Sequence, residues 1–380
     1  MPEDSIGIDE ALVIDVNGRK RIRTQMCRIT GRSVDESITI DPPAHYDMPL
    51  SLLLKAYSGT IQASLVGVED LAISGAINTW AARMSQAYAC WWYNVKINDS
   101  YNNHLFIRDS VNCEVRKCKF ENTIATSIDP NAGVLLDGCS SCIVMDNIIT
   151  KTHNHIQINS GSSGNVIAYN YLYDSKIGNY NRGSIFANYN GHNSFNLFEG
   201  NIGPSFQDSG MWGSSSESVL YRNWFHGTNP DITVSPYTFT INLNRFSRKY
   251  VIVNNVLGEQ NVNNSNIWVG FPNYYNFTFY NLASASGGIW WSDYPNATGR
   301  AGYQELDQDV ITSTTLYNNF KAEDPGIVLD TTSVFANSLF LSEKPTWFGS
   351  LEWPAIDPSN PRTAYTIIPA GYRYAYGVDP

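Results

Sequence analysis

Titratable side chains that could act in acid–base chemistry gather in three stretches between residues 153 and 214. The stretch HNHIQIN (153–159) contains two histidines, SIFANYNGH (184–192) ends in a third, and DSGMWGS (208–214) begins with a carboxylate. A carboxylic acid among aromatic residues acquires a raised pKa, as a general acid requires. We therefore expect a reaction centre around His155, Asn190, His192 and Asp208.

Two reactions fit such a centre, and each needs further groups. Hydrolysis of a glycosidic bond needs a second carboxyl group. The candidates for it are Asp137, Asp174 and Asp231. Elimination next to a uronate carboxylate needs a base and a cation instead. The basic candidates lie in loops: Lys176, Arg182, Arg245 and Arg248. We favour hydrolysis with Asp208 as the acid and keep elimination, with Lys176 or Arg182, as the alternative.

The same stretches alternate apolar and polar residues, which predicts strands with one face turned outward. In HNHIQIN, Ile156 and Ile158 would face inward, and the histidines would face outward together with Gln157. Amides, hydroxyls and indole rings are the side chains that bind sugars. The outward positions of this kind are His153, Gln157, Asn159, Asn188, Asn190, Trp212, Asn242, Asn244 and Trp268, with Arg245 beside them. We expect a long, shallow glycan-binding face, because an ordinary solvated face would carry more Lys, Glu and Thr.

These strands must be positioned by a repeat in which one asparagine recurs. It appears in CIVMDNII, GNVIAYNYLYDS, NLFEGNIG, SVLYRNWF, YVIVNNVL and NFTFYNLA. In register, the members are Asn94, Asn147, Asn170, Asn201, Asn223, Asn255 and Asn281, with Cys118 in the second place and Asn318 as a further candidate. Spacings of 22 to 32 residues are typical of a solenoid with loop insertions. Apolar residues stand four positions before and one position after most of them.

Short β-branched and aromatic segments bounded by Gly, Ser and Asn predict strands, not helices. Each turn of a parallel β-helix bends sharply, and asparagine tolerates the left-handed conformation needed there. Its amide would also bond to the same amide one rung away, about 4.8 Å along the axis. The asparagines are thus expected to form a structural ladder rather than a reactive site.

With these repeats, residues 60–325 resemble the right-handed parallel β-helix of the pectate-lyase-like superfamily. The resemblance implies a fold more than an activity, because the superfamily includes lyases, glycoside hydrolases, esterases, epimerases and phage tailspikes. GNVIAYNYLYDSK followed by NSFNLFEGN is also similar to rungs of alginate lyases related to chondroitinase B, in which a lysine after the strand is the base. The acidic calcium ligands of those enzymes have no clear counterpart here, so calcium is expected only if the protein is a lyase.

Three regions follow from this pattern. Residues 1–60 would form N-terminal strands or a hairpin, residues 61–325 the parallel β-helix, and residues 326–380 an irregular capping tail over the last rung. An all-β fold with a polysaccharide substrate is therefore expected, in an enzyme that acts as a glycoside hydrolase or polysaccharide lyase. A glycan-binding tailspike or adhesin without catalysis is the remaining alternative. We expect a monomer, or a trimer if the protein is tailspike-like.

Composition limits the partners and the location. The net charge is −10 and only 16% of the 380 residues are charged, so nucleic acid is an unsuitable partner. No apolar run reaches the length of a membrane span. The N-terminus carries no signal core, yet a glycan substrate favours an extracellular or periplasmic location, with a leader outside this sequence. The six cysteines fit neither a zinc motif nor a clear disulfide framework.

Overall fold

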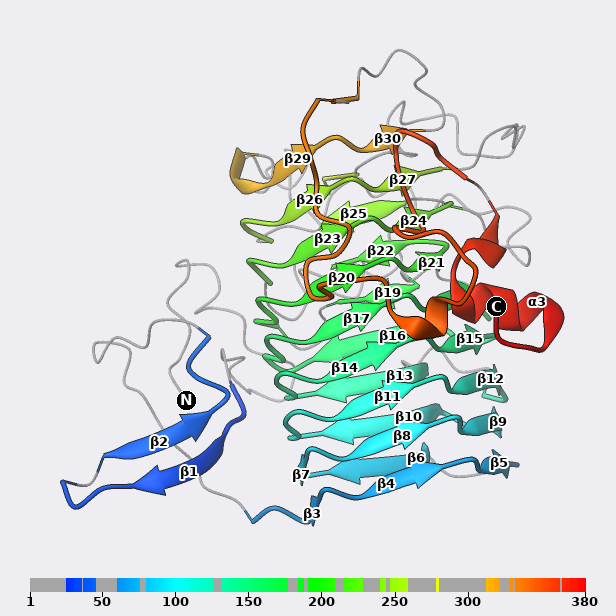
Figure 1. The fold of residues 1–380 in the computed structure, drawn as a ribbon. Helices are drawn as coiled ribbons and strands as arrows, with labels where there is room; N and C mark the ends of the chain where they lie inside the picture. Colours follow the sequence, from blue (N-terminus) through cyan, green and yellow to red (C-terminus); the bar gives the residue numbers. More distant parts are fainter. Residues whose placement is uncertain are drawn as a thin grey trace, which may run out of the picture.

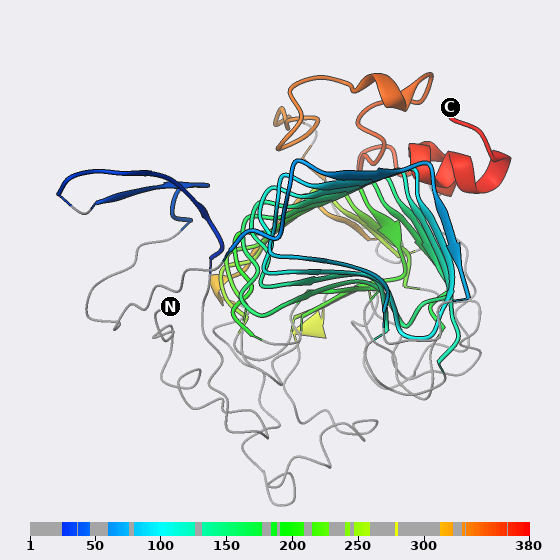
Figure 2. The ribbon, with the colours of Figure 1, turned by 90° about the horizontal axis from the view of Figure 1, so that it is seen from below.

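The computed structural model describes residues 25–35, 37–45, 60–75, 80–125, 131–176, 184–187, 191–208, 215–227, 240–243, 247–258, 278–279, 312–321, 329–330, 332–362 and 364–380. They form a right-handed coil of parallel strands that rises from β4 to β30 (Figure 1). Viewed along the axis, the rungs stack into three sheets around one core (Figure 2). The predicted all-β parallel β-helix is confirmed.

Each rung contributes one strand to each sheet, in the order sheet 1, sheet 2, platform sheet. Sheet 1 consists of β4 (Gly67–Glu69), β8 (Trp91–Tyr93), β11 (Glu114–Arg116), β14 (Ile143–Met145), β17 (Val166–Ala168), β20 (Leu197–Glu199), β23 (Val219–Tyr221), β26 (Val251–Val253) and β29 (Thr315–Tyr317). Sheet 2 consists of β5 (Ala72–Ser74), β9 (Lys96–Ser100), β12 (Lys119–Thr123), β15 (Ile148–Thr150), β18 (Tyr171–Tyr173), β21 (Ile202–Gly203), β24 (Trp224–Phe225), β27 (Val256–Leu257) and β30 (Phe320–Lys321). The platform sheet consists of β6 (Trp80–Ser85), β10 (Asn103–Arg108), β13 (Ala132–Asp137), β16 (Asn154–Asn159), β19 (Ile185–Phe186), β22 (Phe206–Gln207), β25 (Ile241–Leu243) and β28 (Thr278–Phe279).

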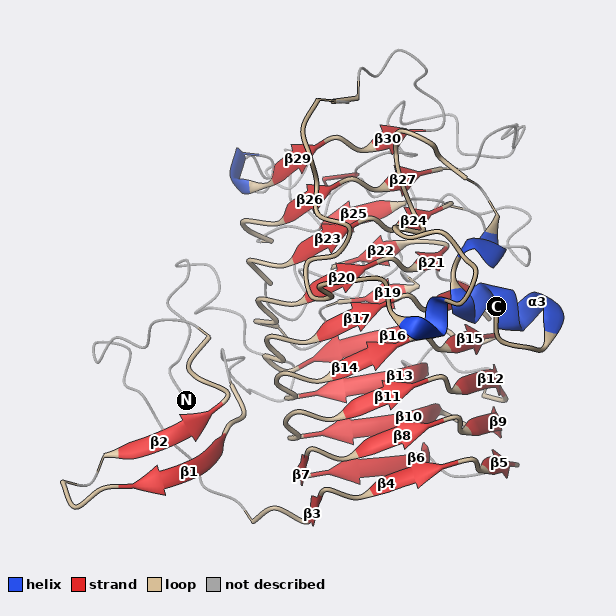
Figure 3. Cartoon of the chain, in the orientation of Figure 1, coloured by secondary structure: helices blue, strands red, loops and turns tan. Residues whose placement is uncertain are grey.

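Strands dominate the coil, whereas α3 (Pro369–Tyr376) lies in the C-terminal tail with the short helices η3 (Thr346–Phe348) and η4 (Tyr365–Ile367) (Figure 3). The central residue of each sheet 1 strand from β11 to β26 points into the coil. These residues are fully buried and apolar: Val115, Val144, Ile167, Phe198, Leu220 and Ile252. Branched and aromatic side chains stacked rung upon rung therefore fill the core.

The asparagine ladder exists at the corner between sheets 1 and 2. The Nδ2 group of each ladder asparagine donates to the Oδ1 atom of the next at 2.9–3.0 Å. Its members are Asn147, Asn170, Asn201, Asn223, Asn255 and Asn319. Each amide also donates to a core-strand carbonyl, as Asn147 does to Val115 at 3.0 Å. Because both amide hydrogens and the oxygen are used, these buried side chains are satisfied.

Three ladder assignments need correction. Asn94 and Asn318 lie one residue too early, and the ladder positions are Val95 and Asn319. The left-handed conformation belongs to this earlier residue, with φ near 52° at Asn94 and 51° at Asn318, and not to the ladder asparagine. Asn281 lies outside the described residues, and Thr278–Phe279 beside it pairs with β25 in the platform sheet. That segment was predicted to belong to sheet 1.

A second, shorter ladder stands at the corner that leads into sheet 1. Asn165 donates from Nδ2 to Asn196 Oδ1 at 2.9 Å, and Asn165 Oδ1 accepts from the Cys142 backbone at 2.9 Å. Each of these asparagines precedes a main ladder member by five residues. The sequence therefore contained the signal for this ladder, although it was not predicted.

The N-terminal part forms a hairpin of β1 (Arg28–Arg32) and β2 (Ile38–Asp41), which projects from the coil (Figure 1). The flanking residues attach to a serine-lined corner of the coil. Met26 donates its backbone N–H to Ser140 Oγ at 2.9 Å, and the His45 ring lies 3.0 Å from Ser163 Oγ. A further short pair, β3 (Ala63–Ser64) with β7 (Ala87–Tyr88), begins the coil.

The C-terminal tail does not sit over the last rung as predicted. It runs back along the outside of sheets 1 and 2 and ends beside β15 (Figure 1). Its buried apolar residues are Phe348, Ala355, Ile356, Ile367, Ile368 and Ala370. They pack on the column one residue after the ladder: Ile148, Tyr171, Ile202, Trp224 and Val256. This packing explains why an outward-facing column is apolar.

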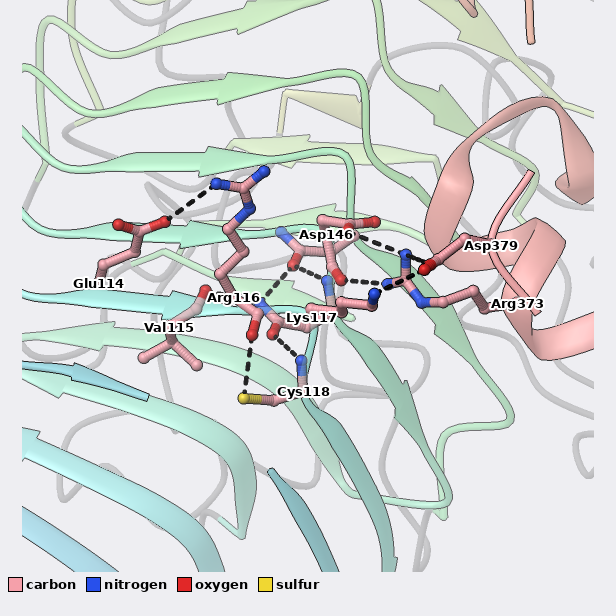
Figure 4. A network of polar contacts seen from close by, with 10 residues as sticks. Glu114, Val115, Arg116, Lys117, Cys118, Asp146, Arg373 and Asp379 are labelled. Carbon is pink, nitrogen blue, oxygen red and sulfur yellow. Dashed lines mark hydrogen bonds and ion pairs between the residues drawn. The ribbon is translucent and has the colours of Figure 1, made fainter. Parts of the chain in front are cut away.

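Polar contacts fix the tail at defined points. Arg373 in α3 donates to the Asp146 carboxylate at 2.9 Å and to its backbone oxygen at 2.6 Å (Figure 4). Asp379 joins Arg373, at 3.5 Å, to Lys117, at 2.6 Å. Burial raises the pKa of Asp146 to about 6 against the opposing effect of Arg373. Glu199 is buried beneath the tail and accepts from Tyr169 and from the Leu339 backbone.

All six cysteines lie in the described part and none forms a disulfide. Among the described residues, no helix is both long enough and apolar enough to cross a membrane.

Candidate functional site

The outer surface of the platform sheet is here called the platform face. Its middle rungs are less open than the sequence suggested. Gln157 and Asn159 do point outward and share a hydrogen bond of 3.0 Å, yet both are buried, as are Phe186 and Asn242. His153, just before β16, is buried as well. The predicted long and shallow open platform is therefore wrong for the described residues of these rungs.

His155 faces the interior, contrary to the prediction. Asn154 Nδ2 donates to Gln157 Oε1 at 2.7 Å, so the outward side holds residues 154 and 157, and the strand bends between them. His155 lies in register with Gly133, where an added Cβ would meet the core side chain of Ile149. Its ring contacts the Tyr173 carbonyl oxygen at 3.0 Å and Ser184 Oγ at 2.6 Å.

The environment of His155 makes it a neutral structural residue. Its side chain is fully buried, and burial lowers its pKa to about 4. His104, in the same register position two rungs earlier, also has a lowered pKa because of burial. His104 and His155 therefore fill the interior of the coil at this corner, and neither faces the outer surface.

Asp208 also lies inside the coil and does not share the column of His155. Gln157, Phe186 and Gln207 are in register, so Asp208, which follows Gln207, takes the inward side that Ile158 takes after Gln157. Its carboxylate accepts from Ser215 Oγ at 2.7 Å and from Ser247. Burial, and then the nearby Asp208 charge, raises the pKa of Tyr250, which bonds to Ser215. A fully buried Asp208 has no route to a polymer outside the coil.

The remaining predicted residues are dispersed. His192 is buried in a left-handed turn (φ 64°) after the platform sheet, and Asp174 is buried in a left-handed turn (φ 58°) after β18. Lys176 donates from Nζ to Asn122 Oδ1 at 3.1 Å and to the Thr123 carbonyl oxygen at 2.8 Å. Arg248 lies at a corner of the coil, where its backbone forms an isolated parallel β-bridge with Ser216. Several candidates lie outside the described residues: Arg182, Asn188, Asn190, Trp212, Asp231, Asn244, Arg245 and Trp268.

The exposed part of the platform face lies at its first rungs. Arg108 ends β10 and Asp137 ends β13, and the two are directly paired between neighbouring strands. Arg108 Nε lies 3.3 Å from Asp109 Oδ2 and 3.8 Å from Asp137 Oδ2. The side chains of Arg108 and Asp109 are 49% and 42% exposed, and that of Asp137 is 18% exposed.

The two carboxyl groups have different surroundings. Partial burial raises the pKa of Asp109, and the Asp137 charge adds to this against the opposing effect of Arg108. Asp137 Oδ1 is buried and has no hydrogen-bond partner among the described residues. One carboxyl group that holds its proton longer, next to another with an uncommitted oxygen, is an arrangement suited to acid–base chemistry.

An aromatic pair adjoins these acids. The Trp80 ring stacks on Phe106 with a centroid distance of 5.4 Å and an interplanar angle of 25°. Trp80 is 38% exposed, whereas Phe106 beneath it is buried. Arg83 lies over both rings, with its Cζ atom 5.2 Å from the Trp80 ring and 5.6 Å from the Phe106 ring.

Of the groups at this exposed end, sequence reasoning identified only Asp137. It missed Trp80, Arg83, Arg108 and Asp109, although the signal was present. Aligning TWAARMS, HLFIRDS and VLLDGCS by their alternation places Arg83 beside Phe106, and Arg108 beside Asp137. The prediction centred instead on the histidines and Asp208 of residues 153–214, which belong to later rungs of the coil.

Metal binding finds no support in the described part. No group of three or more His, Cys, Asp or Glu side chains there is arranged to hold a metal ion. Calcium does not fit between Asp109 and Asp137, because the Arg108 cation contacts both carboxylates. No chemical step is therefore derived through a metal at this site.

No protein-family model matches the chain, and no curated protein matches its sequence. Three crystal structures of DFA-IIIase from Arthrobacter chlorophenolicus are similar in fold. They are a mutant in complex with DFA-III (11% identity, TM-score 0.37), a second structure of this mutant (10%, 0.35) and a complex with GF2 (11%, 0.34). The matches cover 50%, 50% and 49% of this chain and 47%, 47% and 45% of those chains, so the chain matches about half the length of each.

Proposed function

We propose that the protein is a polysaccharide-processing enzyme that hydrolyses a glycosidic bond at the first rungs of the platform face. One observation carries the proposal: two carboxyl groups, Asp109 and Asp137, flank one arginine on an exposed surface beside a stacked tryptophan. Two carboxyl groups in different protonation states are the minimum set for glycoside hydrolysis. An exposed indole supplies the flat apolar surface on which a sugar ring packs.

The roles follow from the two environments. Asp109, whose pKa is raised, would give its proton to the glycosidic oxygen as that bond breaks. Asp137 would act through its carboxylate, either taking a proton from the attacking water or attacking the anomeric carbon itself. Arg108 would hold both carboxyl groups in position, because its Nε atom contacts each of them.

β-Elimination on a uronate-containing glycan is the rival reaction. Arg83 and Arg108 could neutralise the uronate carboxylate, which elimination requires. Its proposed base, Lys176, donates hydrogen bonds to Asn122 and Thr123 from another corner of the coil, so this assignment has less support. A glycan-binding protein without catalysis would use the same aromatic surface but would not need the paired acids. We further propose an extracellular or periplasmic monomer, as expected from the sequence.

The test is product formation from a panel of polysaccharides, followed by reducing-end release and by the ultraviolet absorbance of unsaturated ends. Hydrolysis predicts reducing ends without that absorbance. Asp137→Asn and Asp109→Asn should each lower the rate by about 10²–10⁴-fold, with the fold retained. Glu352→Gln, which alters an exposed carboxylate of the tail, is the matched control.

Three results would each redirect the proposal. Unsaturated products would replace hydrolysis by elimination. Binding without any product would favour the non-catalytic alternative. Full activity in both aspartate variants would show that the reaction occurs elsewhere.

A further inference from the structure

We propose that Arg83 is a specificity-determining residue that binds an anionic group on the glycan, so that the substrate carries a carboxylate or a sulfate ester next to the cleaved bond. This inference rests on the proposed function and identifies the class of its substrate. It places a subsite one rung before the paired acids, where Arg83 and Trp80 would hold one charged sugar unit.

The guanidinium of Arg83 is held by the protein and makes no ion pair with a described carboxylate, although its charge opposes the raised pKa of Asp109. Its Nε atom donates to Ser85 Oγ at 2.6 Å, and its Cζ atom lies over the rings of Trp80 and Phe106. In the described part of the chain, no carboxylate lies within ion-pair distance of Arg83, and its terminal nitrogens donate no hydrogen bond. The planar fork of a guanidinium matches the geometry of a carboxylate or a sulfate.

Other arginines on the described rungs are already used by the protein. Arg108 contacts Asp109 and Asp137, and Arg116 lies 3.8 Å from Glu114. Arg222 donates to backbone carbonyls of the tail. Arg83 is exposed, and the protein as a whole carries a net charge of −10. A cation that lies over aromatic rings and makes no ion pair with a described residue, in an acidic protein, is suited to an anionic ligand.

The position of Arg83 connects it to the reaction centre. Ser85, which accepts from Arg83, is the direct neighbour of Arg108 between β6 and β10. Phe106, over which Arg83 lies, belongs to the same strand as Arg108. A sugar ring packed on Trp80 with its acidic group on Arg83 would therefore place the adjoining linkage toward Asp109 and Asp137.

The experiment compares binding of matched oligosaccharides to the full chain by calorimetry. One pair is an oligouronate and its carboxyl-reduced form, and the other is a sulfated galactan fragment and its desulfated form. The wild type should bind the charged member of at least one pair more tightly, and the pair that shows the difference identifies the anion. Arg83→Gln should weaken that binding by about ten- to a hundredfold and leave the neutral member unchanged.

Two further variants separate charge from packing. Arg116→Gln is the matched control, because Arg116 also lies over an indole, Trp347 at 5.2 Å, but away from the site. It should leave binding of both members unchanged. Arg83→Lys keeps the charge without the planar fork and should retain part of the preference. In steady-state kinetics Arg83→Gln should raise KM for the charged substrate more than it lowers kcat.

The outcomes distinguish this inference from the function on which it rests. Equal affinity of the wild type for charged and neutral members, or equal weakening of both by Arg83→Gln, overturns the role of Arg83. Cleavage of the neutral glycans in that case leaves the proposed hydrolysis intact. A wild type that binds none of the four glycans and cleaves none of the panel overturns both.

Discussion

Two outer faces of the coil carry an arginine above an indole ring, and they differ in what covers that ring. On sheet 1, Arg116 lies 5.2 Å from the ring of Trp347, which belongs to the C-terminal tail, and Glu114 compensates its charge. On the platform sheet, Arg83 lies 5.2 Å from the ring of Trp80, which is 38% exposed. The first arrangement joins two parts of the protein, whereas the second leaves an aromatic and cationic surface open to a ligand.

This comparison shows how an outward aromatic column in a repeat should be interpreted. Tyr171, Ile202 and Trp224 occupy outward positions on sheet 2, as Phe106 and Leu135 do on the platform sheet. The first set is covered by the tail. An apolar outward position therefore indicates a binding surface only when no other segment of the same chain packs on it.

The largest expected effect concerns the covered face. Phe348 is fully buried where the tail meets the coil, so Phe348→Ala should lower the free energy of unfolding by about 3–5 kcal/mol. Val334, on the same tail, is fully exposed, and Val334→Ala should change stability by less than about 0.5 kcal/mol. Denaturant unfolding measures both. If the two variants are equally stable, the tail is not packed as described.

Hydrogen exchange sharpens this test. If the tail detaches before the coil unfolds, Phe348→Ala should speed exchange at the Leu339 and Tyr372 amides, which are bonded in the wild type, and leave the Val219 amide protected. Uniform loss of protection would instead show that tail and coil unfold together.

The second prediction separates the ladder from the turn that precedes it. Asn201→Ala removes a buried amide that bonds to Asn223, to the Ile167 carbonyl and to the Asn170 backbone and amide, so it should cost about 1–3 kcal/mol. Asn94→Ala removes one exposed contact, to Asp70, and leaves alanine in the left-handed turn, which together should cost less than the buried amide. Thermal unfolding of both variants provides the comparison. A larger loss for Asn94→Ala would restore the original register.

Much of the fold could be predicted because the repeat constrains it locally. The variable spacing, the short β-rich segments and the recurring asparagine together indicate a solenoid of strands. The register slipped at Asn318–Asn319, where two asparagines are adjacent, whereas in Asn254–Asn255 the second asparagine was assigned correctly. Only the second of each pair can enter the ladder, because the first must adopt the left-handed turn.

The site was harder to predict, for physical reasons that differ by residue. The orientation of Asp208 was predicted from its distance in sequence to a ladder asparagine. Loops of unequal length lie between the two, so this distance does not fix the side of the strand, and Asp208 was wrongly predicted to face outward. His155 turned inward because its strand bends at the corner, and alternation does not reveal a bend. The tail location depends on contacts between segments over a hundred residues apart, such as Glu199 with Leu339. No local pattern records them.

The third prediction concerns pH on the covered face. Burial raises the folded-state pKa of Asp146 to about 6 from its ordinary value of 3.8, so the folded state binds this proton more tightly than the unfolded chain. Stability from this group is therefore present below pH about 4 and is lost as the pH rises through 6. Asp146→Asn should remove that fall, which we expect to amount to roughly 1–3 kcal/mol.

The measurement is the difference in unfolding free energy between wild type and Asp146→Asn across pH 4–7. Arg373→Gln should enlarge the fall, because the Arg373 cation opposes the raised pKa. A difference that is constant over this range would mean that Asp146 is not desolvated beneath α3, and the described attachment of the tail would then be wrong.

The smallest expected effect returns to the open face. Trp80→Ala should change the free energy of unfolding by no more than about 1 kcal/mol, because the ring is partly exposed and packs mainly on Phe106. It should weaken glycan binding several-fold or more, since a stacked ring is lost.

Trp224→Ala on the covered face should do the reverse, with a large loss of stability and unchanged glycan affinity of the folded fraction. Calorimetric binding and thermal unfolding of the two variants decide it. If Trp80→Ala binds glycan as the wild type does, the open indole is not a sugar platform. The two faces would then differ in coverage but not in function.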